Sequence, residues 1–171
     1  MLRIDTLTYR IGPRLLLDGA SATVNPGHRV GLVGRNGCGK TTLLRLITGE
    51  LDADGGGTEM PNGWRIGIST QEAPGGPESL IETVLAADPE LAALTAEAET
   101  ATDAHRIADI HARLHDKGAH AAPARAARIL AGLGFDDEAQ QKPCGEFSGG
   151  WRMRVALAAL LFNAPDLLLL D

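Results

Sequence analysis

The chain has 171 residues and a formal net charge of −6, a length that suits one domain with a sizeable core rather than two domains. The acidic balance argues against a protein that coats nucleic acid or an anionic membrane through bulk charge. No apolar stretch approaches the roughly 20 residues that span a bilayer, and the N-terminus has no secretory pattern. Cys38 and Cys144 have no spacing that supports a disulfide, so we expect free thiols in a cytoplasmic protein.

The first part of the chain predicts short strands around one helix. Apolar residues alternate imperfectly over 1–9, the turn "IGPR" follows, and a second strand is expected over 15–24. The run "HRVGLVG" predicts a strand over 29–33, and apolar residues at helical spacing beyond it predict a helix that Gly49 ends. "DADGGGTEMPNG" is interpreted as a loop, and "WRIGIST" as a short strand before a loop around Gln71.

An alanine-rich helical region starts near Ser79. Ser79 and Glu82 have the spacing of a capping box, and "DPE" places an N-cap residue before proline at the first helical position. We expect one helix over 89–115, a break at "KGAHAAP", and a further helix that ends at Gly132 or Gly134.

The last part of the chain is interpreted as a loop to Phe147, a helix over 150–162 and a strand at "LLLLD". The four leucines suit a central parallel strand that is buried on both faces.

The segment "GRNGCGKT" fits the phosphate-loop pattern G-x-x-x-x-G-K-[ST]. Glycines let backbone N–H groups curl around a phosphate, and the following helix adds its positive end. Lys40 is expected to reach the β and γ phosphates of a nucleotide, and the Thr41 hydroxyl to bind Mg²⁺. A role limited to shaping the loop stays open for Arg35 and Asn36. The predicted nucleotide contacts are Gly34, Asn36, Gly37, Cys38, Gly39, Lys40, Thr41 and Thr42.

Two further residues are candidates for the same site. Asp171 ends the apolar strand, and the upstream phosphate loop favours its placement beside that loop, where its carboxylate would hold Mg²⁺ through water. Gln71 follows another strand and could contact the metal or the attacking water, with simple solvation as the alternative.

A second glycine motif, "EFSGGWRMRVAL", is surplus to a single nucleotide site. Ser148 is a suitable N-cap, Gly149 and Gly150 allow close backbone approach, and a helix N-terminus favours an anion. An ordinary capped helix is the alternative on these residues alone.

The order "GRNGCGKT", Gln71, "SGGWRMRVALAALL" and "LLLLD" resembles the ATP-binding domain of ABC proteins. The resemblance implies an α/β fold of the P-loop NTPase, ABC ATPase type, with an antiparallel β subdomain and a helical subdomain. It implies ATP and Mg²⁺ as cofactors, with Thr41, Gln71 and Asp171 near the metal. It also implies that Ser148, Gly149 and Gly150 close over ATP held by a second, facing ATPase domain.

Within that family the chain is similar to the ABC-F branch, whose members have two ATPase domains in one chain, no membrane domain, and in many cases a role on the ribosome. Trp151 stands where transporter subunits usually have glutamine, and the interval from Gln71 to Ser148 leaves room for an inserted helical arm. The resemblance implies a P-loop core and β subdomain over 1–78, a helical subdomain with an arm-like insertion over 79–147, and a signature helix and Walker B strand over 148–171. The expected partners are a second ATPase domain of the same chain and the ribosome.

The chain departs from the family pattern at a few positions. Phe147 replaces a leucine and Thr41 a serine, while Ile11 occupies the place of the aromatic residue that stacks on adenine, with Tyr9 two residues earlier as a candidate. The family's catalytic glutamate would follow Asp171, so we expect a domain that is incomplete at its C-terminus and that alone binds nucleotide poorly or does not hydrolyse it. The alternatives to an ABC-F ATPase are the energy-coupling subunit of a membrane transporter and a DNA-acting ABC ATPase.

Overall fold

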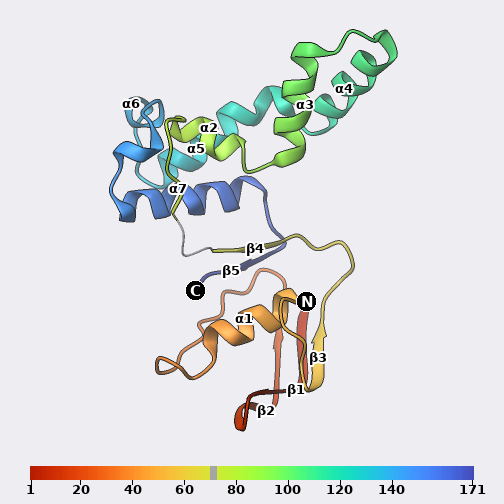
Figure 1. Ribbon diagram of the computed structural model, residues 1–171, viewed down its shortest axis with the longest axis vertical. Helices are drawn as coiled ribbons and strands as arrows, with labels where there is room; N and C mark the ends of the chain where they lie inside the picture. Colours follow the sequence, from red (N-terminus) through yellow and green to blue (C-terminus); the bar gives the residue numbers. More distant parts are fainter. Residues whose placement is uncertain (70–72) are drawn as a thin grey trace. The chain divides into compact units, whose positions relative to one another are not determined.

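The computed structural model describes residues 1–69 and 73–171 and divides into two compact units (Figure 1). One unit, here called the loop unit, comprises Met1–Ile66 and Asp166–Asp171. The other, the helical unit, comprises Gly67–Pro165. The subdivision expected at residues 78 and 147 stays a prediction.

The loop unit contains an antiparallel sheet of β1 (Leu2–Ile11), β2 (Arg14–Val24) and β3 (Gly55–Glu59), in the order β2-β1-β3. The two strands predicted at the N-terminus are therefore confirmed. The register of β1 against β2 shifts between Ile4 and Leu7, and Thr6 between them has a left-handed φ of 46°. This irregularity explains the imperfect alternation, because it returns Leu7 to the buried side that Leu2 and Ile4 occupy.

The prediction of a loop at "DADGGGTEMPNG" was wrong, because β3 lies within it and pairs with β1. The sequence GGGTE has no apolar alternation, so only the pairing with β1 defines it as a strand. Gly56 has φ 69°, and a Cβ there would lie 2.3 Å from the Asp5 carbonyl oxygen. Glycine is therefore required for this close approach of the two backbones.

The predicted strand over 29–33 was also wrong, since these residues form no strand in the structure. Val30, Leu32 and Val33 are 65%, 47% and 93% exposed. A strand is defined by hydrogen bonds to a neighbour, which apolar composition alone does not supply. By contrast, the predicted helix after the phosphate loop is confirmed as α1 (Lys40–Thr48), which ends at Gly49 in the left-handed conformation with φ 77°.

The strands β4 (Ile66–Ile68) and β5 (Leu167–Leu169) form a two-stranded sheet. Arg65 and Asp166, the residues just before these two strands, are joined by two hydrogen bonds. The Asp166 carboxylate accepts from the Arg65 N–H at 2.9 Å, and the Asp166 N–H donates to the Arg65 carbonyl at 2.9 Å. Both strands were predicted. The prediction that the strand "LLLLD" is buried on both faces was wrong at its end, because Leu170 is 59% exposed.

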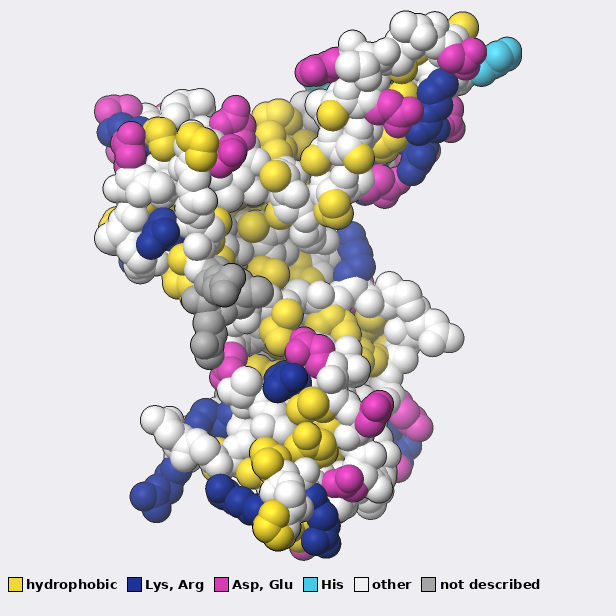
Figure 2. Space-filling view, viewed as in Figure 1, with side chains coloured by type: hydrophobic (Ala, Val, Ile, Leu, Met, Phe, Trp, Pro, Cys, Tyr) yellow, Lys and Arg dark blue, Asp and Glu magenta, His cyan; other side chains and the backbone are white. Residues whose placement is uncertain are grey.

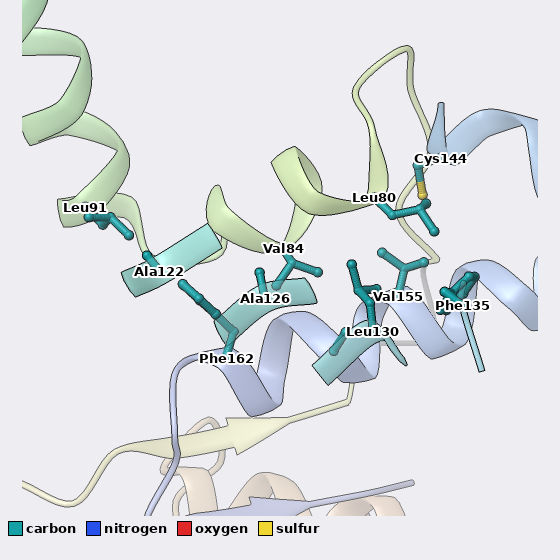
Figure 3. Close-up of a cluster of buried hydrophobic side chains, with 11 residues drawn as sticks. Leu80, Val84, Leu91, Ala122, Ala126, Leu130, Phe135, Cys144, Val155 and Phe162 are labelled. Carbon is teal, nitrogen blue, oxygen red and sulfur yellow. The ribbon is translucent and has the colours of Figure 1, made fainter. Parts of the chain in front are cut away.

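Among its described residues, the helical unit contains six α-helices and two short 3-10 helices. Its elements are α2 (Leu80–Leu85), α3 (Pro89–Thr100), α4 (Ala104–Asp116), η1 (Ala119–Ala121), α5 (Ala122–Gly132), α6 (Asp137–Gln140), η2 (Cys144–Glu146) and α7 (Gly149–Phe162). Buried side chains of α2, α5 and α7 meet in its core, including Val84, Leu130 and Val155 (Figure 3). The sequence predicted α5 and α7 but not α6 or η2. No helix among the described residues has the length and apolar character needed to cross a membrane.

The predicted caps of the helical unit are present. Ser79 and Glu82 form a complete capping box at α2, with the Ser79 side chain accepting from the Glu82 N–H and the Glu82 side chain accepting from the Ser79 N–H. Asp88 caps α3 ahead of Pro89 by accepting from the Leu91 N–H at 2.9 Å. Directly after α7, Asn163 Nδ2 donates a hydrogen bond to the Ala87 carbonyl at 2.8 Å.

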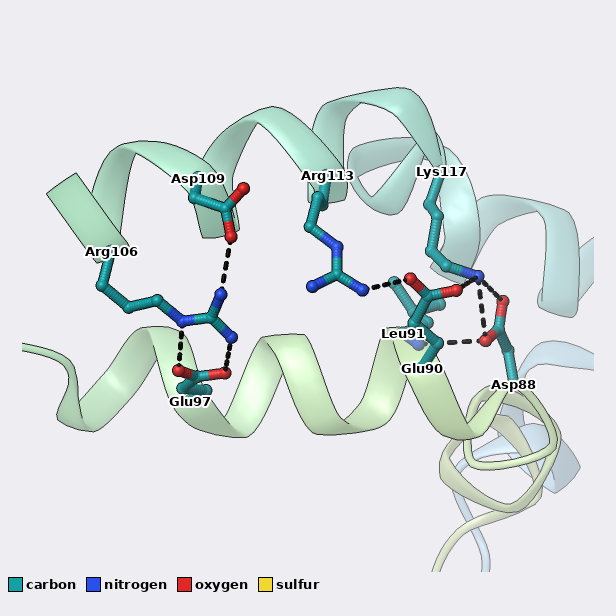
Figure 4. Close-up of polar contacts among 8 residues, drawn as sticks. All are labelled: Asp88, Glu90, Leu91, Glu97, Arg106, Asp109, Arg113 and Lys117. Carbon is teal, nitrogen blue, oxygen red and sulfur yellow. Dashed lines mark hydrogen bonds and ion pairs between the residues drawn. The ribbon is translucent and has the colours of Figure 1, made fainter.

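The single helix predicted over 89–115 was wrong, because the segment is a hairpin of α3 and α4, here called the arm hairpin. Asp103 accepts a hydrogen bond from the Arg106 N–H at 2.8 Å and starts α4 as a new helix. Ion pairs join the two helices: Arg106 forms a two-pronged contact with Glu97 at 2.6 and 2.7 Å, and Arg113 contacts Glu90 at 2.6 Å (Figure 4). Figure 2 shows acidic and basic side chains next to one another on this segment. The two helices also bury apolar side chains, so charge pairing and burial together order the hairpin: Leu91, Leu94 and Ile110.

Candidate nucleotide-binding site

The phosphate-loop segment Gly34–Thr41 leads into α1 through two glycines, Gly37 and Gly39, in a backbone conformation that strains most other residues. Gly37 and Gly39 have φ of 75° and 104°. A Cβ on Gly39 would lie 2.9 Å from the Leu16 side chain, and one on Gly34 would lie 2.5 Å from Cys38 Sγ. The glycines therefore permit both the backbone conformation and the close contacts of the loop.

Lys40 folds its side chain back over the loop that precedes it. Its Nζ donates hydrogen bonds to the carbonyl oxygens of Gly34 at 2.9 Å and Arg35 at 3.2 Å. The loop is further closed by a turn in which the Cys38 N–H donates to the Arg35 carbonyl at 3.2 Å. A cation is thus held at the N-terminus of α1, where the helix dipole also favours an anionic ligand.

Thr41 and Asp171 meet in the loop unit although they are far apart in the sequence. Thr41 Oγ1 donates to Asp171 Oδ2 at 2.5 Å. A hydroxyl and a carboxylate are oxygen ligands of the kind that Mg²⁺ prefers, and Mg²⁺ sites usually combine one or two protein groups with water and phosphate oxygens. The residues present therefore fit a magnesium ion whose remaining ligands come from a nucleotide and solvent. No group of three or more His, Cys, Asp or Glu side chains that could hold a metal alone occurs in the described ranges.

The turn between β1 and β2 approaches the phosphate loop. Arg14 Nη2 donates to the Gly37 carbonyl at 3.4 Å, and Leu16 packs beside Gly39. Tyr9, the candidate for adenine stacking, is half-buried on β1 and pairs with Leu17, next to Leu16 on β2. Sequence reasoning missed Arg14 and Leu16, because a cation or an apolar residue near a turn carries no motif.

The other predicted contacts are placed as follows. Asn36, Gly37 and Cys38 are exposed on the loop, and Thr42 is half-buried in the first turn of α1. Gln71 lies outside the described residues.

The second glycine motif forms the start of α7 in the helical unit. Ser148 is the N-cap residue with φ −63° and ψ 159°, but its side chain makes no capping hydrogen bond, unlike Ser79 at α2. Ser148, Gly149 and Gly150 are exposed, and a Cβ on either glycine would have open space within 4 Å. An exposed serine and two exposed glycines thus stand at the start of a 14-residue helix, and a helix N-terminus suits an anionic ligand.

Comparisons with known proteins indicate the family of the chain. The family pattern described as ABC transporter matches residues 17–171. The chain is 47% identical over its whole length to "Probable ATP-binding protein YheS" of Escherichia coli strain K12, and 42% identical over 99% of its length to "ATP-binding cassette sub-family F member 3" of Homo sapiens. It spans 27% and 25% of the lengths of these two relatives.

Solved structures support the same fold. A nucleotide-free ATP-binding cassette from an ABC transporter aligns with a TM-score of 0.68 and 24% identity, over the entire chain and 68% of that structure. The cbiO1 protein of Clostridium perfringens, part of the transporter complex cbiONQ, aligns with a TM-score of 0.67 and 22% identity over 99% of the chain and 64% of that structure. At these identities the likeness concerns the fold alone.

The family match, the two relatives and the shared fold confirm the α/β, P-loop NTPase class that the motifs predicted. ABC ATPase domains bind and hydrolyse ATP as a family. The chain therefore belongs to the ABC transporter family, as an ATP-binding domain of the ABC-F type.

Proposed function

We propose that this domain holds Mg²⁺ and ATP at the phosphate loop, and that it does so as one of two ATPase domains in a longer protein. The contact between Thr41 and Asp171 carries the proposal, because it joins the two metal-binding groups at the end of the loop that holds Lys40. Phosphoryl transfer to water depends mainly on positioning and on neutralising charge. Lys40 and the amides of Gly34–Thr42, Asn36 and Cys38 included, supply both toward the phosphates.

The remaining roles follow the same chemistry. Thr41 and Asp171 would hold Mg²⁺, and the ion would neutralise developing charge on the phosphates. Gln71 contacts the metal or the attacking water, and Tyr9 stacks on adenine near Arg14 at the start of β2. In the family pattern, the water-activating glutamate comes directly after the aspartate that Asp171 matches.

The phosphate-loop role is tested with Lys40→Ala in the whole protein. A charge-assisted hydrogen bond to phosphate contributes enough that its loss should weaken ATP binding by about 10- to 100-fold. Lys142→Ala is the matched control, because Lys142 pairs with Glu138 at 2.8 Å on the helical unit and should leave ATP affinity unchanged. Equal affinities for the two variants, measured with a fluorescent ATP analogue, would contradict the proposed site.

The signature motif of Ser148, Gly149 and Gly150 acts, in this proposal, on ATP held by the facing ATPase domain. Its exposed hydroxyl and free helix start support that role, because neither is used to stabilise α7 through a side-chain cap. Ser148→Arg should leave ATP binding at Lys40 intact and abolish both turnover and ATP-driven closure, which small-angle scattering can follow. If binding and closure fell together, the motif would have been assigned to the wrong site.

We further propose that the whole protein acts on the ribosome in the cytoplasm, with the arm hairpin as an element that contacts it. The ABC-F resemblance supports the ribosome as partner, and the ion-paired hairpin at 89–116 supports an ordered projection rather than a loose insertion. The test is sedimentation with ribosomes in ATP, in ADP and in a non-hydrolysable analogue. A variant whose arm hairpin is replaced by a short glycine linker should sediment less, and absence from ribosomes in all three nucleotides would rule out this role.

A further inference from the structure

The signature motif provides few contacts to hold itself in place. Gly149 and Gly150 have no side chains, and a Cβ on either would meet nothing within 4 Å. Ser148 does not cap its own helix. The position of the first turn of α7 must therefore be set by the residues on either side of the motif.

Those flanking residues are both aromatic and both contact the same third ring. Phe147 precedes the motif and meets Phe135 edge-to-face, with ring centroids 5.7 Å apart and planes at 82°. Trp151 follows the motif and meets Phe135 with centroids 5.0 Å apart and planes at 62°. Such aromatic pairs stabilise a protein by more than the burial of their apolar surface alone, because the positive edge of one ring meets the negative face of the other.

Phe135 is well suited to act as a fixed point. It is 2% exposed and lies against α7 near its start (Figure 3). Its N–H donates to the Leu130 carbonyl at 3.1 Å, and its carbonyl accepts from Nε2 of the buried Gln140 at 3.0 Å. Hydrogen bonds to other residues of the helical unit therefore fix both backbone polar groups of Phe135, and with them the position of its ring.

A second contact holds Trp151 from its outer face. The Arg154 guanidinium lies 4.4 Å from the centre of the Trp151 ring, and Arg154 Nη1 donates to the Leu133 carbonyl at 3.2 Å. Gly134 makes room for this contact, since a Cβ there would lie 3.3 Å from Arg154 Nη1. Its φ of 95° is also a conformation that favours glycine. The segment 133–135 thus holds the start of α7 through both an aromatic and a cationic contact.

We propose that Phe135 is a positioning residue for the signature motif, with Arg154 as its secondary support. Phe135 fixes Phe147 and Trp151, and these hold Ser148 and the first amides of α7 in the orientation needed to engage ATP on the facing domain. The inference rests on the proposed role of Ser148. It predicts that a change at Phe135 affects turnover without affecting ATP binding at the phosphate loop.

The test compares Phe135→Leu with Phe162→Leu in the whole protein. Phe162 is the matched control, because it is 3% exposed in the same core and lies at the opposite end of α7, under the Arg125 guanidinium. Both changes remove a buried ring and should lower the melting temperature. Only Phe135→Leu should lower kcat, by about tenfold for two lost aromatic pairs, with ATP affinity unchanged.

Arg154→Gln tests the same idea without a core substitution, because Arg154 is exposed and the variant cannot fail through a cavity. We expect kcat to fall about threefold at unchanged ATP affinity, as for the loss of an exposed cation–π contact. Equal kcat losses in Phe135→Leu and Phe162→Leu, or full kcat in Phe135→Leu and Arg154→Gln, would overturn the inference. Full turnover in Ser148→Arg would instead contradict the proposed function itself.

Discussion

Thr41 and Asp171 are separated by 130 positions in the sequence, yet Thr41 Oγ1 lies 2.5 Å from Asp171 Oδ2. Thr41 lies in the first turn of α1 and Asp171 follows β5, so the fold brings a hydroxyl near a helix start next to a carboxylate near a strand end. This relationship makes the dependence of turnover on Mg²⁺ the most direct test of the site.

Asp171→Asn keeps the shape of the side chain but removes its charge. Because carboxylates that orient a metal typically contribute 10- to 100-fold in affinity, we expect the Mg²⁺ concentration for half-maximal turnover to rise by about that factor. Asp166→Asn is the control, since Asp166 lies at the other end of β5 and pairs with Arg65. Identical Mg²⁺ titrations for the wild type and Asp171→Asn would show that Asp171 does not contribute to Mg²⁺ binding.

The two cysteines offer a chemical probe of the phosphate loop. Both are free, with Cys38 exposed on the loop and Cys144 buried. Burial raises the pKa of the Cys144 thiol, which further lowers its reactivity as a thiolate. We expect iodoacetamide to modify Cys38 in the native protein and Cys144 only after unfolding, as mass spectrometry can show. ATP should slow modification of Cys38, and labelling at the same rate with saturating ATP would argue against nucleotide at this loop.

The arm hairpin should loosen in acid. Hydrogen bonds from the Arg106 guanidinium lower the pKa of Glu97, and those from Lys117 and Arg113 lower the pKa of Glu90, in both cases below the ordinary 4.5. A carboxyl whose folded pKa is lowered adds stability that is complete above its unfolded pKa and is lost as the pH falls through the folded pKa. Amide exchange of residues 89–116 should therefore accelerate, after correction for intrinsic rates, below about pH 4.5.

Arg106→Gln supplies the control for that measurement. It removes both hydrogen bonds to Glu97 and so should speed exchange at pH 7 while reducing the further acceleration in acid. The pairs are exposed to solvent, so high salt should produce part of the same effect. Exchange in the hairpin that is insensitive to both pH and the substitution would show that apolar contacts such as that of Leu91 maintain it.

Local chemistry predicted much of the fold. The capping box at Ser79, the left-handed glycine at Gly49 and the turn before Arg14 each depend on neighbours within a few residues, and the structure confirms them. The break in the arm was missed although Asp103 is itself a good N-cap, because the alanine-rich sequence on both sides favours helix.

Features that depend on distant partners could not be predicted in the same way. β3 exists because the backbone of β1 pairs with GGGTE, and the exposed run at 29–33 forms no strand despite its β-branched residues. The contacts of Arg14 with Gly37 and of Phe135 with Trp151 join residues 23 and 16 positions apart that belong to no recognisable motif. Among the predicted site residues, only those of the phosphate loop have a spacing specific enough to indicate their role by itself. The role expected for Ser148, Gly149 and Gly150 came from the resemblance to ABC proteins.

The two N-cap serines should differ in their contribution to stability. Ser79 uses its hydroxyl to accept the Glu82 N–H, whereas Ser148 makes no such bond. Ser79→Ala should therefore lower the free energy of unfolding by about 0.5–2 kcal/mol, the usual range for a lost N-cap. Ser148→Ala should change it by less than about 0.5 kcal/mol, as for a surface substitution, while reducing ATP turnover. Urea denaturation measures the first quantity and a phosphate-release assay the second. A Ser148→Ala variant as destabilised as Ser79→Ala, with normal turnover, would reduce the second glycine motif to an ordinary helix cap.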